Sequence, residues 1–194
     1  MASNSPILLL IDIQHGLVQS PPSWGPRSNP QLTENVADLL KTWRARSWPV
    51  LHVYHDDLEE PDNPIQAKFP ETFKPHASAA PLESEPVFIK HVGSPFVDTG
   101  LAKEIERLEK DGKRKIVVIG MDVSQCVNNT VRHGTDLGYD MLVVGDACAG
   151  YGAGDWKDGK QLGAEETFHY ALSLLSGYGK IVTTKDVLKA LGYE

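Results

Sequence analysis

Short runs of apolar residues alternate along the chain with longer segments in which apolar residues recur every three or four positions. The first run, ILLLI at residues 7–11, has the length and composition of a strand that is buried on both faces. The segment after it places a set of apolar residues on one face of a helix: Leu32, Val36, Leu39, Leu40 and Trp43. The chain is therefore predicted to begin with a strand followed by an amphipathic helix.

The same alternation continues to the end of the chain. Five more strands are predicted, at PVLHVY (49–54), PVFIK (86–90), KIVVIG (115–120), DMLVVG (140–145) and KIVT (180–183). Helices are predicted after the third to the sixth strand: one with Leu101, Ile105 and Leu108 on one stripe, one from Ser124, one from about Gln161 to Ser176, and one capped by Thr184. Such alternation indicates parallel strands joined by right-handed crossovers, with helices on both faces of the sheet. We predict an α/β fold, a three-layer sandwich around a six-stranded parallel sheet.

Three irregular segments interrupt this pattern, and each follows the carboxyl end of a predicted strand. The longest, between His55 and Glu85, is rich in proline and much longer than an ordinary connection. The other two are VQSPPSWGPRSN (18–29) and YGAGDWKDGK (151–160). Open α/β sheets bind ligands at the carboxyl ends of their strands. We therefore expect these segments to surround the functional site, with the longest one covering the substrate.

Composition excludes several classes of partner. The chain has 194 residues, enough for one domain, which we predict to span residues 1–194. Its 19 Lys and Arg against 26 Asp and Glu give a net charge of -7 without a basic block, so neither a nucleic acid nor an anionic membrane is expected as a partner. No apolar run is long enough to span a membrane, and the first residues lack the pattern of a signal peptide. We expect a cytoplasmic protein that acts on a small molecule.

Three residues able to carry out chemistry stand at the ends of different strands. Asp12 follows the first strand, Lys90 ends the third, and Cys126 comes shortly after the fourth, at the start of a helix. The carboxyl ends of parallel strands share one edge of the sheet, so an acid, an amine and a thiol can meet there. A thiol with an ordinary pKa of about 8.5 must lose its proton before it attacks, and the N-terminus of a helix favours the thiolate. Asp12 could accept that proton, and Lys90 could stabilise the charges.

Each of these residues also has an ordinary structural explanation. An aspartate after a strand can cap the following loop, a lysine at a strand end can be solvated, and a cysteine on a helix is most often a packing residue. The second cysteine, Cys148, is predicted to be such a packing residue, since small residues surround it in GDACAG. Two cysteines make no disulfide framework. Taken one by one, the three residues leave both interpretations open.

Three sequence blocks resemble a known family. They are LLLIDIQHGLV (8–18), FIKHVGSPFVDTGL (88–101) and VVIGMDVSQCVNNTVRHGTDLGY (117–139). In this order and spacing they are similar to the aspartate, lysine and cysteine blocks of the isochorismatase-like cysteine hydrolases, which include nicotinamidases and N-carbamoylsarcosine amidohydrolases. The resemblance covers nearly the whole chain. It implies a Rossmann-like sheet with the strand order 3-2-1-4-5-6, and a homo-oligomer, either a dimer or a tetramer.

The resemblance also implies roles for individual residues. Asp12 would be the proton acceptor and Lys90 the orienting ammonium. Cys126 would be the nucleophile, forming an acyl-enzyme that water then releases. A cis peptide bond is expected between Met121 and Asp122, with the backbone N–H groups of Asp122 and Cys126 forming the oxyanion hole.

Nicotinamidases carry an Asp-x-His pattern after the second strand that contributes metal ligands. Here that region contains His52 and His55, which on a strand would point to opposite faces. His52 is expected to be a packed strand residue, and His55 to belong, with Asp56, to the pocket or the loop. We therefore expect no metal ion and no cofactor. Four residues beside the predicted sheet edge are candidates for substrate binding: Trp24, Phe96, Gln14 and Asn129. For Gln14, an ordinary structural amide is the alternative.

The leading hypothesis is a cysteine hydrolase that cleaves a C–N bond of a small amide, ureide or carbamoyl compound through an acyl-enzyme on Cys126. Isochorismatases proper cleave a vinyl ether and typically lack this cysteine, so the presence of Cys126 favours acyl transfer over ether hydrolysis. An isochorismatase-type hydrolase of another small molecule is the first alternative. A thiol redox or sensor protein is the second, although the chain has no C-x-x-C motif. A nucleotide-binding Rossmann module is the third, although no glycine-rich loop follows the first strand.

Overall fold

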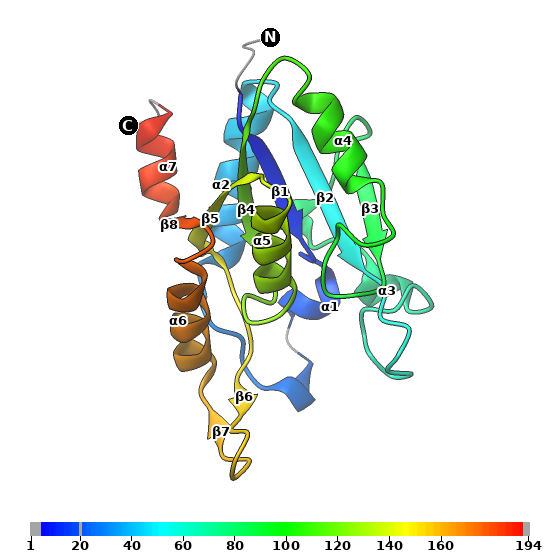
Figure 1. Ribbon diagram of the computed structural model, residues 1–194. Helices are drawn as coiled ribbons and strands as arrows, with labels where there is room; N and C mark the ends of the chain where they lie inside the picture. The colour runs from blue at the N-terminus through cyan, green and yellow to red at the C-terminus, as the bar shows by residue number, and fades with distance from the viewer. Residues whose placement is uncertain (1–4, 20, 192–194) are drawn as a thin grey trace.

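The sheet at the centre of the fold has six parallel strands in the order β3-β2-β1-β4-β5-β8 (Figure 1). The strands are β1 (Ile7–Ile11), β2 (Val50–His55), β3 (Val87–Lys90), β4 (Lys115–Gly120), β5 (Asp140–Cys148) and β8 (Lys180–Val182). The structure, a computed structural model, describes residues 5–19 and 21–191. Counted along the chain, β8 is the sixth strand of this sheet, so the predicted α/β fold with the order 3-2-1-4-5-6 is confirmed.

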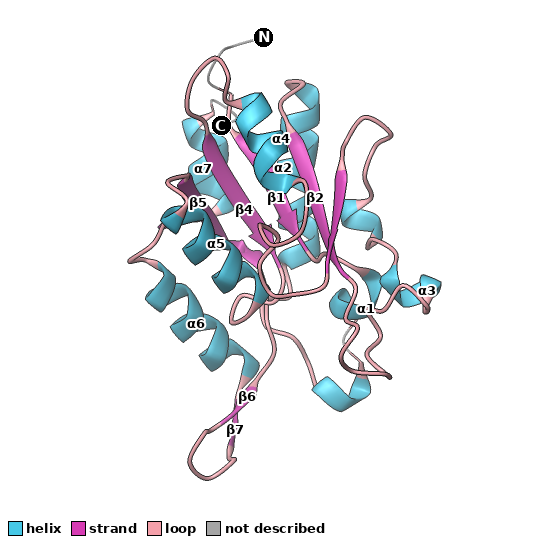
Figure 2. Cartoon of the chain, turned by 45° about the vertical axis from the view of Figure 1, so that its right-hand side comes forward, coloured by secondary structure: helices cyan, strands magenta, loops and turns pink. Residues whose placement is uncertain are grey.

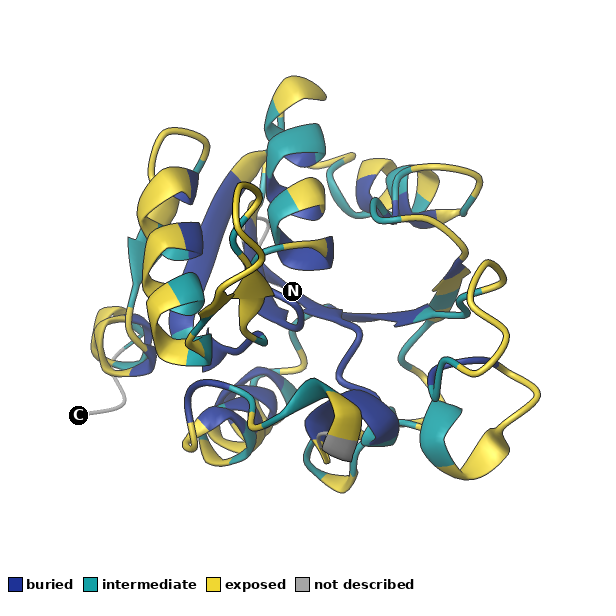
Figure 3. Cartoon of the chain, turned by 90° about the horizontal axis from the view of Figure 1, so that it is seen from below, coloured by how far each residue is buried: buried dark blue, intermediate teal, exposed yellow. Residues whose placement is uncertain are grey.

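Helices cover both faces of the sheet (Figure 3). The helical segments are α1 (His15–Val18), η1 (Pro22–Trp24), α2 (Leu32–Ala45), α3 (Pro70–Phe73), η2 (Ala77–Ala79), α4 (Leu101–Leu108), α5 (Cys126–Asp136), α6 (Ala164–Leu175) and α7 (Thr184–Ala190). Residues of α1, α2 and α7 form one core with the sheet, and residues of α4, α5 and α6 form the other. Successive strand residues point to opposite faces, so Leu8 and Leu10 belong to the first core and Leu9 to the second. Within the described residues, every helix falls short of the length and apolarity that a membrane crossing needs.

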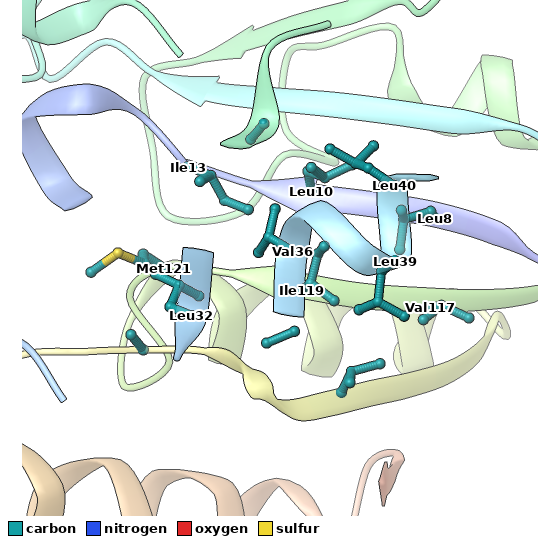
Figure 4. Packing of buried hydrophobic residues seen from close by; sticks show 14 of the residues in the cluster. Leu8, Leu10, Ile13, Leu32, Val36, Leu39, Leu40, Val117, Ile119 and Met121 are labelled. Atoms are coloured by element: carbon teal, nitrogen blue, oxygen red, sulfur yellow. The ribbon is translucent and has the colours of Figure 1, made fainter. Parts of the chain in front are cut away.

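The apolar stripe predicted for α2 packs on the first face of the sheet. Its members are buried almost completely: Leu32, Val36, Leu39, Leu40 and Trp43. Figure 4 shows the aliphatic members of this stripe against side chains of β1 and β4. Burying a side chain of this size contributes about 2 kcal/mol. The stripe therefore anchors α2 to the sheet, and Trp43 adds a hydrogen bond from Nε1 to the Pro6 carbonyl at 3.0 Å.

A two-stranded hairpin follows β5. Its strands, β6 (Ala153–Gly154) and β7 (Gln161–Leu162), pair in antiparallel fashion, and the hairpin projects away from the sheet (Figures 1 and 2). The helix expected from about Gln161 therefore begins later, as α6 at Ala164. A strand of two residues leaves no periodic signal in the sequence. For this reason the sequence pattern predicts a helix that already includes Gln161.

Two helix starts also differ from the prediction. Helix α5 begins at Cys126, two residues after Ser124. Helix α7 is capped by Thr183 and not by Thr184, because the Thr183 hydroxyl accepts the Asp186 N–H while the Asp186 carboxylate accepts the Thr183 N–H. Thr184 is the first helical residue.

The carboxyl ends of β1 and β4 approach each other closely at Gly120. The φ angle of Gly120 is 134°, and a Cβ atom at this position would lie 2.0 Å from the Ile11 carbonyl oxygen. The next residue, Met121, donates its N–H to the same oxygen at 2.9 Å. Only glycine has both the conformational freedom and the small size for this approach. It brings Asp12, which follows β1, close to the loop that follows β4.

Candidate active site

The side chains of Asp12, Lys90 and Cys126 meet at the carboxyl edge of the sheet. Asp12 follows β1 with a φ of 51°, Lys90 is the last residue of β3, and Cys126 is the first residue of α5. The ammonium Nζ of Lys90 lies 2.8 Å from Asp12 Oδ2 and 3.2 Å from Cys126 Sγ. Since β2 separates β3 from β1, a side chain as long as lysine is needed to reach Asp12. The structure thus places the three predicted residues in one buried cluster.

Burial and charge set the protonation of this cluster. Burial, together with the Asp12 carboxylate, raises the pKa of the Cys126 thiol to about 12, although the Lys90 ammonium acts in the opposite direction. Burial alone would lower the pKa of Lys90, but the charge of Asp12, and that of the Cys126 thiolate where it forms, outweigh burial and raise this pKa. At neutral pH the cluster therefore holds a neutral thiol beside a charged ammonium. Such a thiol needs a base before it can act as a nucleophile.

Asp12 lies where it can take the thiol proton. Its side chain is wholly buried, and within the described part of the chain no hydrogen-bond donor reaches its Oδ1. A carboxylate oxygen of Asp12 and the sulfur of Cys126 lie within 4.8 Å of each other. A buried acceptor without a donor is costly. A proton received from Cys126 would relieve that cost.

The loop between β4 and α5 presents two backbone N–H groups beside the thiol. The peptide bond between Met121 and Asp122 is cis, which confirms the prediction. The Asp122 carbonyl accepts hydrogen bonds from Gln125 N–H at 3.1 Å and from Val127 N–H at 3.0 Å, but not from Cys126 N–H. Among the described residues, neither Asp122 N–H nor Cys126 N–H donates to another group. Two free backbone donors beside a nucleophile are the groups that an oxyanion hole needs.

The Asp122 side chain holds this loop in place. Its carboxylate accepts hydrogen bonds from the N–H and the hydroxyl of Ser124, both at 2.7 Å, and from Tyr151 N–H at 2.9 Å. Burial raises the pKa of Asp122, although these hydrogen bonds act in the opposite direction. Val123 N–H donates to the Ala149 carbonyl at 2.9 Å. The loops after β4 and β5 are therefore tied together.

His55, the last residue of β2, is a further polar group beside the thiol. Its Nδ1 lies 3.7 Å from Cys126 Sγ. The side-chain amide of Gln14 holds the His55 backbone from two sides, accepting His55 N–H at 2.8 Å and donating to the His55 carbonyl at 3.1 Å. Burial, with the charge of Lys90, lowers the pKa of His55. The ring is therefore neutral at pH 7 and can accept a proton.

A cavity of about 470 Å³ lies against Cys126. Its wall combines the segment after β1, the segment after β2, the loop after β4 and the β6–β7 hairpin. The segment expected to cover the substrate contributes four lining residues: Asp57, Glu60, Asn63 and Ile65. With Asp12 and Asp122, the wall has four carboxylates, and its described lining contains neither lysine nor arginine.

Trp24 is the one residue of the four substrate-binding candidates that lines this cavity within the described chain. Its ring meets the ring of Tyr151 edge to face, with 5.3 Å between the centroids. Gln14, by contrast, is fully buried, and its amide is engaged by the His55 backbone and the Phe73 carbonyl. Gln14 therefore corresponds to the structural amide that was its alternative interpretation.

Phe96 and Asn129 are not among the described residues that line the cavity. The ring of Phe96 stacks on Tyr139, with 5.5 Å between the centroids, and packs against the second core. The side chain of Asn129 lies beside Gly93, where a Cβ atom would come within 2.3 Å of Asn129 Nδ2. Both residues therefore pack the loop after β3 against the layer that contains α5.

His55 was expected in the pocket or the following loop, but not among the catalytic or substrate-binding residues. The signal that could have identified it is its place at the end of the second strand, whose carboxyl end neighbours that of the first. His52, three residues earlier, points elsewhere, as predicted, and its Nε2 lies 3.0 Å from Glu85 Oε2.

Asp12, His55 and Cys126 bring three ligand-type atoms within 4.8 Å of one another. The Lys90 ammonium, however, contacts both Asp12 and Cys126. A metal ion held by these residues would face that positive charge at short range. The group therefore fits an ionised catalytic cluster better than a metal site.

Comparisons with known proteins identify the family. The family model described as the isochorismatase domain matches residues 6–172. Over 187 residues the chain is 34% identical to the isochorismatase family protein YddQ of Bacillus subtilis, covering 94% of this chain and 98% of that protein. Over 155 residues it is 34% identical to the secreted isochorismatase effector Isc1 of Verticillium dahliae, covering 79% and 75% of the two chains.

Solved structures agree with this assignment. The crystal structure of an isochorismatase-family protein from Chromobacterium violaceum matches with a TM-score of 0.86 at 33% sequence identity, and the match covers 100% of this chain and 97% of that chain. An isochorismatase hydrolase structure from Oleispira antarctica matches with a TM-score of 0.82 at 28% identity, covering 97% and 98%. The chain therefore belongs to the isochorismatase family of hydrolases.

Proposed function

We propose that the protein is a cysteine hydrolase that cleaves a C–N bond of a small amide, ureide or carbamoyl compound through an acyl-enzyme on Cys126. The observation that carries this proposal is the Lys90 ammonium, which lies 2.8 Å from Asp12 Oδ2 and 3.2 Å from Cys126 Sγ beside a cavity. An acceptor for the proton, a cation for the thiolate and a sulfur nucleophile are the groups that attack on a carbonyl carbon requires.

The first half-reaction forms the acyl-enzyme. The thiol proton moves to Asp12 as the sulfur of Cys126 attacks the carbonyl carbon of the substrate. Lys90 stabilises the developing thiolate, and the N–H groups of Asp122 and Cys126 hold the oxyanion. Asp12 then gives the proton to the leaving nitrogen as the C–N bond breaks. The acyl group stays on the sulfur, and the amine or ammonia departs.

The charge of the cavity favours such substrates over isochorismate. Asp57 and Glu60 add two carboxylates to the wall, and its described lining contains no lysine or arginine. Isochorismate carries two carboxylates. In the cavity these would lose their hydrating water, and cationic side chains would have to replace it. The cleavage of its vinyl ether also requires a general acid and no sulfur nucleophile. A neutral or cationic substrate rich in N–H donors matches these walls.

Mass spectrometry of the acid-quenched enzyme tests the proposal. The protein is mixed with nicotinamide, biuret, carbamoyl amino acids and other small amides, and then digested. We expect an acyl or carbamoyl adduct on the peptide that contains Cys126 and no adduct on the peptide that contains Cys148. Turnover of an amide without a detectable adduct under single-turnover conditions would contradict the covalent mechanism.

Glu60→Lys is expected to change the charge preference for the substrate. Glu60 lines the cavity, is exposed, and forms no ion pair with any described residue. The ratio of kcat/KM for an amide with an ammonium group to that for its carboxylate analogue should fall about tenfold, because the charge of one lining residue is reversed. Glu59→Lys is the matched control, since it makes the same change in net charge one residue away from the lining. An equal fall in both variants would show that Glu60 does not contact the substrate.

A further inference from the structure

The two half-reactions need a proton acceptor in different places. In acylation the proton leaves the sulfur of Cys126, which lies within 4.8 Å of a carboxylate oxygen of Asp12. In deacylation the proton leaves a water molecule that enters from the cavity. Asp12 also lines the cavity, but it has 0% of its surface exposed and its Oδ2 is held by the Lys90 ammonium at 2.8 Å. His55 is only partly buried, lines the cavity, and places Nδ1 3.7 Å from the sulfur.

We propose that His55 is the base that activates the water in deacylation, so that Asp12 serves the first half-reaction and His55 the second. This inference rests on the proposed function, because it requires an acyl group on Cys126. The acyl carbon is bonded directly to Sγ, and Nδ1 lies 3.7 Å from that sulfur. A water molecule bound to Nδ1 is therefore adjacent to the carbon that it must attack.

The proton balance of this step closes without another reactant. Nδ1 of His55 takes one proton from the water as the water oxygen bonds to the acyl carbon. The N–H groups of Asp122 and Cys126 hold the oxyanion. When the C–S bond breaks, the sulfur leaves with the electron pair, and protonated His55 returns the proton to Sγ. The acid product departs, and both the thiol and the neutral imidazole are restored.

The local structure fixes His55 in this position. Gln14 is fully buried and bonds to the N–H and the carbonyl of His55, and its Nε2 also donates to the Phe73 carbonyl at 3.0 Å. In the parallel ladder, His55 pairs with Lys90. The backbone is thus held on both sides, so only side-chain rotation remains to move the ring. Gln14 thereby acts as a positioning residue for His55.

The charges around His55 leave its ring able to accept a proton at neutral pH. The titratable groups that face it are Lys90, His91, Asp12, Asp57 and the neutral thiol of Cys126. Burial, followed by the charge of Lys90, outweighs the two carboxylates and lowers the pKa of His55 below its ordinary value of 6.5. As the pH falls through that pKa, the ring becomes protonated, and deacylation slows.

Pre-steady-state kinetics of His55→Asn separates the two half-reactions. With an amide that the wild-type enzyme hydrolyses, we expect a burst of released amine at the wild-type rate, followed by turnover that is slower by about 100-fold. The acyl-enzyme on Cys126 should accumulate to nearly one equivalent, as measured by mass spectrometry. His91→Asn is the matched control, because His91 is exposed, lies near Asp56 and does not line the cavity. It should behave like the wild-type enzyme.

Failure of this inference is distinguishable from failure of the proposed function. If the wild-type enzyme forms the adduct but His55→Asn releases it at the wild-type rate, or loses the burst, the role of His55 is overturned. If wild-type Cys126 never carries an adduct, the proposed function itself is overturned. If His55→Asn does not fold, the decay of the wild-type acyl-enzyme is measured instead, between about pH 5 and 8. Its rate should fall on the acid side with a midpoint below 6.5, and a rate independent of pH would refute the proposal.

Discussion

Replacing Cys126 by alanine is expected to lower kcat by at least about 10⁴-fold toward any amide that the wild-type enzyme hydrolyses. Without the sulfur no acyl-enzyme forms, and only the oxyanion donors and substrate binding remain to assist direct attack by water. The change removes one buried atom, so the free energy of unfolding should fall by only about 1 kcal/mol. A product assay gives the rate, and urea denaturation gives the stability.

Cys148 provides the matched control for this experiment. It is fully buried in the second core and does not line the cavity. Burial raises the pKa of its thiol to about 12, so Cys148, like Cys126, is a neutral thiol at pH 7. Cys148→Ala should therefore lose a similar amount of stability and keep its kcat. Equal kcat values for the two variants would show that Cys126 is not the nucleophile.

Lys90→Met is expected to lower both the activity and the stability. Methionine retains most of the length and the apolar stem but removes the ammonium. Asp12 then remains as a buried carboxylate without its cation, and the free energy of unfolding should fall by about 3 kcal/mol. The thiolate of Cys126 also loses its stabilising charge, so kcat should fall by about 100-fold or more.

The stability lost in Lys90→Met is expected to decrease at alkaline pH. In the folded protein the pKa of Lys90 is raised above its ordinary value of 10.5. A group whose pKa is raised by folding contributes its full stabilisation below the unfolded pKa and loses it as the pH rises through the folded pKa. The difference between wild type and Lys90→Met should therefore shrink as the pH rises above 10.5, as measured by urea midpoints at several pH values.

Two further variants test the explanation for Lys90. The double variant Asp12→Asn, Lys90→Met removes both buried charges and should recover part of the lost stability while remaining inactive. Lys115→Met removes an exposed ammonium that pairs with Asp140 at 2.5 Å, and should change the stability by less than about 1 kcal/mol. Equal losses in Lys90→Met and Lys115→Met would mean that the buried ion pair is not the cause.

The positions that could be predicted from the sequence are those fixed by regular elements. Asp12 and Lys90 stand at strand ends, and Cys126 at a helix start, so parallel topology alone was enough to bring them to one edge of the sheet. The apolar stripe of α2 followed from its helical spacing. The strand order and the cis bond before Asp122 depended on the resemblance to a family, because neither follows from periodicity.

Side chains in irregular segments could not be placed in the same way, since no repeat fixes their direction. Phe96 was close to the site in sequence, yet its ring packs against Tyr139. Asn129 lies one helical turn after Cys126 but contacts the loop at Gly93. Glu60 lines the cavity only because of the path of a long connection. Such contacts are determined by tertiary packing.

The β6–β7 hairpin supplies part of the cavity wall from outside the central sheet. Gly154 and Gln161 line the cavity from a small sheet of their own, whereas the reacting groups stand on the central sheet and on α5. The turn between them, with Trp156 at 92% exposure, has no part in the core. Insertions or deletions in this turn are therefore expected to change the cavity wall while both cores stay intact. The shape of the cavity can thus be altered in one segment without moving Asp12, Lys90 or Cys126.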